Sequence, residues 1–156
     1  MTPNLLFVFL AALVPMIIGF IWYNPKVMGT VWMEASGMTD EKIKGGNMPL
    51  IFGLSFVFSL MLSFGIFFLV VHQSHVFSLL MNHKEEWESF MDVHGTAYRS
   101  FGHGAFHGTL DGFLIVLPVL ATNALFERKG FKYIWVNTGY WVLTLALMGG
   151  ILCAWA

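Results

Sequence analysis

The chain has 156 residues, of which 57% are hydrophobic and 11% are charged, and its formal net charge is −1. A soluble domain carries about 25% charged residues, because its surface must be wetted. The composition therefore excludes an ordinary soluble domain and predicts that the lipid bilayer is the main partner of the chain. The net charge also excludes a strongly basic chain, so we expect no nucleic-acid partner.

Four apolar segments follow one another along the chain, each close to the ~20 residues that a helix needs to cross a bilayer. They cover residues 5–23, 50–71, 104–126 and 133–155, and the third alone contains a charged residue, Asp111. Backbone polar groups in lipid must bond within their own segment, which favours helices. We predict an all-α integral membrane bundle of four transmembrane helices, forming a single domain over residues 1–156. Pro118 should kink the third helix.

The loops between these segments differ in charge. The first and third loops, residues 24–49 and 127–132, together contain six Lys or Arg residues, and the central loop, residues 72–103, contains two. The positive-inside rule places the two basic loops in the cytoplasm. We therefore expect a multi-pass protein of the inner (cytoplasmic) membrane of a bacterium, with both termini and the central loop outside, in the periplasm. Aromatic and charged residues between Lys84 and Arg99 predict a short amphipathic helix within that loop.

Small residues at every fourth position form a ridge on three of the predicted helices. Spacing by four places such residues on one helical face, where they allow transmembrane helices to approach closely. The ridges are Ser55, Ser59 and Ser63; Gly104, Gly108 and Gly112; and Ala146 and Gly150. They predict tight helix packing and a homo-oligomer or a larger membrane complex. The short third loop makes the last two helices antiparallel neighbours.

Histidines are confined to the middle of the sequence, and two of them share a helical face with Asp111. His103, His107 and Asp111 are spaced by four residues. Imidazole and carboxylate groups are suitable ligands for a zinc-like divalent transition metal, and His72 and His75 complete a site if the second and third helices are neighbours. In the alternative, the histidines are interfacial side chains and His107 hydrogen-bonds Asp111. The spacing matches no established metal-binding motif.

Asp111 lies about 10 Å into the third helix at 1.5 Å per residue. Carboxylates within a membrane are energetically unfavourable, face the bundle interior and commonly serve a function. The alternative is a paired carboxylate that contributes only to packing.

Several short stretches resemble one family of membrane proteins. They are residues 21–29 (IWYNPKVMG), Trp32-Met33, residues 36–39 (SGMT), residues 126–129 (FERK), Asn137, Gly139 and Tyr140. Together they resemble the domain of unknown function 1761 family of small bacterial four-span membrane proteins, over nearly the whole chain. The resemblance implies a fold class and a membrane location, and it supplies no catalytic residue and no cofactor.

Three functions fit these patterns. The packing ridges and the lack of a catalytic motif favour a non-enzymatic oligomeric scaffold or an accessory subunit of a membrane complex. The alternatives are a proton- or metal-linked transporter or channel that uses Asp111 and His107, and a metal-dependent membrane enzyme.

Overall fold

The computed structural model describes residues 2–156; Met1, the first residue of the expected domain, lies outside this range. Within residues 2–156, all regular elements are helical, and four helices are long and apolar enough to cross a membrane. These candidate spans are α1 (Leu5–Trp22), α4 (Met48–Val70), the continuous helix Phe101–Phe126 and α9 (Phe131–Trp155). The predicted all-α class is confirmed, and each span begins and ends within three residues of the expected positions.

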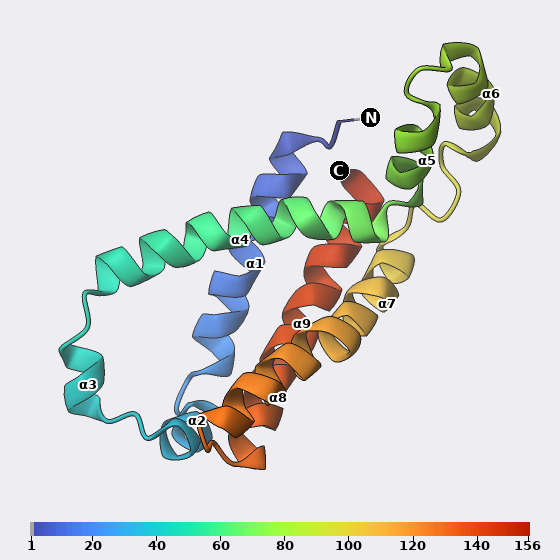
Figure 1. Cartoon of the computed structure of the whole chain (residues 1–156). Helices are drawn as coiled ribbons and strands as arrows, with labels where there is room; N and C mark the ends of the chain where they lie inside the picture. Colours follow the sequence, from blue (N-terminus) through green and yellow to red (C-terminus); the bar gives the residue numbers. More distant parts are fainter. Residues whose placement is uncertain (1) are drawn as a thin grey trace.

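Short helices lie at the two ends of the long ones (Figure 1). At one end are α2 (Gly29–Ser36) and α3 (Asp40–Lys44). At the other end α5 (His72–Leu80) and α6 (Lys84–His94) form a hairpin, and both chain termini lie at this same end. Helix α6 falls in the segment where the sequence predicts an amphipathic helix.

The third span changes its helical geometry midway. It consists of α7 (Phe101–Asp111), the π-helix η1 (Gly112–Val116) and α8 (Leu117–Phe126). Pro118 lies in the first turn of α8 and has no backbone N–H to donate to the preceding turn. The Leu117 N–H bonds to the Gly112 carbonyl, a wider π-type interval. The irregularity expected at Pro118 thus takes the form of a π-bulge immediately after Asp111.

Helices α7 and α9 pack closely because glycines face their contact. A Cβ added at Gly104 would overlap the Gly149 carbonyl, and one added at Gly108 would overlap the Leu145 carbonyl. One added at Gly112 would lie 2.7 Å from Val142 Cγ2. The expected glycine ridge therefore lies directly on the backbone of α9. Of the residues expected on α9, Gly150 lies beneath the Phe101 ring, and Ala146 has its backbone nitrogen near Gly108.

Helices α1 and α4 complete the core against α9. The largest buried side chains include Phe67 on α4, and Met148 and Leu152 on α9. Side-chain hydrogen bonds also join these helices, and two of them come from buried hydroxyls. The Ser63 hydroxyl donates to the Val8 carbonyl at 2.8 Å, and the Tyr140 hydroxyl donates to the Pro15 carbonyl at 2.8 Å. These bonds provide buried hydroxyls with acceptors where no water is available.

Helix α4 crosses α1 and α9 instead of running beside them along its length (Figure 1). Its second half is packed, with Ser59, Ser63 and Phe67 buried. Residues 49–58 are exposed on all sides apart from the half-buried Phe56. Ser55 lies in this half and is exposed, so the serine ridge contacts other helices only at Ser59 and Ser63.

Candidate metal centre

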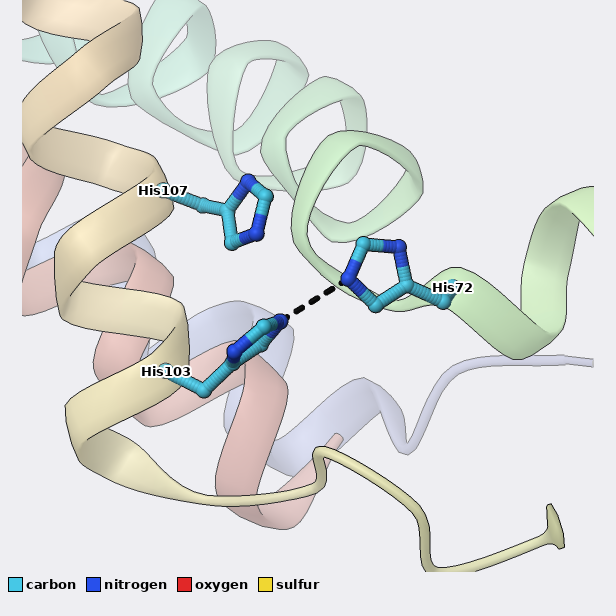
Figure 2. Close-up of side chains that lie close together, drawn as sticks. All are labelled: His72, His103 and His107. Carbon is cyan, nitrogen blue, oxygen red and sulfur yellow. Dashed lines mark hydrogen bonds between the residues drawn. The ribbon is translucent and has the colours of Figure 1, made fainter.

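Three histidines meet at the end of the spans that carries the termini. His72 is the first residue of α5. The residue before it, Val71, is extended and separates α5 from α4. His103 and His107 lie one turn apart in the first turns of α7, whose start is capped by the Ser100 hydroxyl accepting from the His103 N–H at 3.3 Å. Figure 2 shows all three imidazole rings pointing into the same space from the two helices.

The distances within this group are short. His72 Nε2 and His103 Nε2 lie 2.8 Å apart and share a hydrogen bond. The ring centroids are 5.0 Å apart for His72 and His103, 5.1 Å for His72 and His107, and 4.6 Å for His103 and His107. One ligand nitrogen from each ring lies within 4.8 Å of the other two. We call these three residues the histidine triad.

The triad has the donor set and nearly the dimensions of a zinc site. Tetrahedral coordination with Zn–N bonds of ~2.0–2.1 Å requires ligand nitrogens roughly 3.3 Å apart. In the triad, the nitrogens of His72 and His103 lie 2.8 Å apart, and all three ligand nitrogens lie within 4.8 Å of one another, so the required spacing falls inside this range. The three side chains are half-buried, and small rotations of their rings would bring the nitrogens to this spacing. Three imidazoles leave the fourth tetrahedral position open for water or another ligand.

The electrostatic surroundings favour a neutral imidazole at His72. Burial lowers the pKa of His72, and the nearby His103 and His75 lower it further. The 2.8 Å bond between His72 and His103 requires one ring nitrogen to donate and the other to accept, so the accepting nitrogen carries no proton. A neutral imidazole is the form that binds a transition metal.

The family is shown by comparison with family models. The model described as protein of unknown function (DUF1761) matches residues 6–153. The chain is a member of the DUF1761 family. No curated protein and no solved structure matches the chain. Membership supports the resemblance seen in the sequence, and the family's description assigns no activity.

Of the five metal ligands expected from the sequence, this DUF1761 member brings together His72, His103 and His107. His75 is exposed, and it lies outside the triad. Asp111 is also outside the triad. It ends α7 one turn beyond His107, and its Oδ2 atom is buried without a hydrogen-bond partner in residues 2–156. The remaining histidines lie elsewhere: His83 is 3.3 Å from Glu86, and His94 packs on Phe90.

Two residues beside the triad are not among the site residues expected from the sequence. The Tyr98 ring packs against His72 and His103, with centroid distances of 5.9 Å and 5.1 Å. Gln73 follows His72, is 2% exposed, and donates from its amide to the loop before Tyr98. The apolar residues around Gln73 are the local feature of the sequence that could have indicated its burial.

Proposed function

We propose that the chain is a metal-binding membrane protein in which His72, His103 and His107 hold one zinc-like divalent transition metal ion. The observation that carries this proposal is the convergence of three imidazole nitrogens, from two helices, within 4.8 Å of one another. The triad contains no cysteine, and its open fourth position distinguishes it from closed structural zinc sites. An exchangeable or catalytic ion fits it better than a permanently structural one.

The triad and the termini face the periplasm in this proposal. Six Lys and Arg side chains lie at the opposite end of the spans, between α1 and α4 or around the turn from α8 to α9. They are Lys26, Lys42, Lys44, Arg128, Lys129 and Lys132. The positive-inside rule supports a cytoplasmic position for those loops in a bacterial inner membrane. The site would then take its ion from outside the cell membrane.

Metal titration of the purified protein tests this proposal. Protein in mild detergent, first stripped with a chelator, is titrated with Zn²⁺, and we expect one ion per chain. Separate substitutions His72→Ala, His103→Ala and His107→Ala should each weaken binding by about 100-fold or more, since even outer-shell changes weaken metal affinity by 10–100-fold. His75→Ala is the matched control, because it removes an exposed histidine of the same helix outside the triad. Absence of stoichiometric zinc, or equal losses in His75→Ala and His103→Ala, would refute the proposal.

Asp111 favours transport as the use of the bound ion. It lies one turn beyond His107 within the third span, and its Oδ2 atom is buried without a partner in residues 2–156. Burial of an unpaired carboxylate oxygen is costly, and ionisable residues within a span commonly serve a function. In this version of the proposal, Asp111 accepts the ion or a proton as the ion moves deeper. Zinc entry into liposomes that contain the protein should then disappear in Asp111→Asn while zinc titration still gives one ion per chain. Unchanged entry in Asp111→Asn would leave the triad as a binding or catalytic site without a transport role.

The second candidate is an assembly role, as an oligomeric scaffold or an accessory subunit. Support comes from residues 49–58 of α4, an apolar half-helix that contacts almost nothing within the chain. Native mass spectrometry from mild detergent should then show a defined oligomer, which Phe52→Ala combined with Phe58→Ala weakens. Phe20→Ala, at an exposed position of α1, is the control. A monomer at all protein concentrations would eliminate the homo-oligomer.

A further inference from the structure

Tyr98 has an unusual backbone conformation next to the triad. Its φ angle is +60°, in the left-handed region that bulky residues rarely adopt. Strained residues of this kind concentrate at functional sites, where the surrounding structure holds them in place. The position of Tyr98, five residues before His103 and directly beside two triad rings, makes the strain relevant to the site.

Contacts from two other helices hold this conformation. The buried amide of Gln73 on α5 donates to the His94 carbonyl at 2.9 Å and to the Ala97 carbonyl at 2.8 Å. Cys153 on α9 donates from its thiol to the Tyr98 carbonyl at 3.3 Å. The loop is thus attached on one side to the residue that follows His72 and on the other side to α9. The backbone on both sides of Tyr98 is fixed, which directs its ring.

The ring covers one side of the His72–His103 pair. It meets His72 edge-on, with an interplanar angle of 84°, and lies more nearly parallel to His103, with an angle of 33°. Tyr98 as a whole is 70% exposed, so the rest of the ring faces away from the protein. An aromatic ring in this place covers one face of the pair and leaves the imidazoles less room for large rotations on that side.

We propose that Tyr98 is a positioning residue of the metal centre, whose ring orients His72 and His103 and slows exchange of the bound ion. This inference rests on the proposed zinc site and adds a kinetic role to it. If Tyr98 served only to stabilise the fold, Tyr98→Gly would lower the unfolding temperature of the metal-free protein. Glycine adopts φ of +60° without strain, so removing the ring in Tyr98→Gly leaves the backbone relaxed.

The test measures how fast the zinc-loaded protein releases its ion to an excess of chelator. Compared with the unmodified protein, Tyr98→Gly should retain one zinc per chain and release it about tenfold faster or more. Removal of outer-shell partners weakens metal affinity by 10–100-fold, and we expect this loss to appear in the release rate. Its metal-free form should unfold at the same temperature as the unmodified protein or higher. Tyr98→Phe, which keeps the ring, should release zinc at the original rate.

A second ring-less variant guards against a folding defect. Tyr98→Asn also tolerates left-handed backbone and should release zinc as fast as Tyr98→Gly. Release at the original rate from folded Tyr98→Gly or Tyr98→Asn would overturn the inference while leaving the zinc site intact. Equally fast release from Tyr98→Phe would also overturn it, because the hydroxyl and not the ring would then be responsible. Failure of the proposed site itself is seen separately, as the absence of stoichiometric zinc in the unmodified protein.

Discussion

His72 Nε2 and His103 Nε2 lie 2.8 Å apart, although the two residues are 31 positions apart in sequence and belong to different helices. In the metal-free protein this contact needs a single shared proton, because two protonated nitrogens would repel each other. A metal ion placed between the triad rings replaces that proton. The stability of this end of the protein should therefore depend on pH and on whether a metal ion is bound.

Acid should destabilise the metal-free protein through His72. Burial, together with His103 and His75, lowers the pKa of His72 in the folded protein. His72 is therefore protonated more readily in the unfolded chain than in the folded chain. Its contribution to the free energy of unfolding is present above pH ~6.5 and is lost as pH falls below that value. The unfolding temperature of chelator-treated protein, measured between pH 7.5 and pH 5, should decrease on acidification. His72→Gln should flatten this decrease, and an identical slope in both proteins would contradict the assignment.

Gly108 should tolerate no larger residue. A Cβ at this position overlaps the backbone of Leu145, and neither backbone can move away without opening the contact between α7 and α9. We expect Gly108→Ala to reduce the free energy of unfolding by about 1–3 kcal/mol, as overpacked sites do. Gly102→Ala, on the same helix, is the control and should cause no loss, because its new Cβ would meet no neighbouring helix of residues 2–156 within 4 Å. Equal unfolding temperatures for the two variants would show that the helices are not in this close contact.

The hydrogen bond from Tyr140 to Pro15 should contribute measurably to stability. Tyr140 is 8% exposed, and its hydroxyl donates to the Pro15 carbonyl of α1 at 2.8 Å. Tyr140→Phe should lower the free energy of unfolding by about 0.5–1.5 kcal/mol, the usual net value of such a bond. Tyr133→Phe is a suitable comparison, since Tyr133 packs near Lys129 through its ring. A greater loss in Tyr133→Phe than in Tyr140→Phe would contradict the contact.

The ion pair between Lys132 and Glu34 should contribute little. The two side chains meet at 2.6 Å, and both are more than half exposed. Exposed ion pairs typically contribute only about 0–1 kcal/mol. Lys132→Ala should therefore leave the unfolding temperature nearly unchanged at moderate salt. A large decrease would mean that α2 is held to the start of α9 mainly by this pair.

The parts of the fold that follow from local sequence were predictable. Each span is a long apolar run, and the spacing of the glycines at positions 104, 108 and 112 is enough to place them on one helical face. The short loop at residues 127–132 forces its two helices to be antiparallel neighbours. These features depend only on residues close together in the chain.

The parts that depend on tertiary contacts were not predictable. Both halves of α4 are equally apolar, so the sequence does not reveal that one half leaves the bundle. The sequence offers His72 as a partner of His103 and His107 only on the condition that the second and third helices are neighbours. In the structure that condition is met where Val71 separates α4 from α5. Tyr98 owes its conformation to Gln73 and Cys153, which come from two other helices. No local pattern places Tyr98, Gln73 and Cys153 together.

X-ray absorption at the zinc edge tests the central claim most directly, because it reports the ligands of the bound ion. Zinc-loaded protein should show a first shell of nitrogen and oxygen at ~2.0–2.1 Å with the scattering pattern of three imidazoles. In His103→Ala the imidazole count should fall or the zinc should be lost. A sulfur shell at ~2.3 Å, or a first shell of oxygen without imidazoles, would show that the histidine triad is not the metal site.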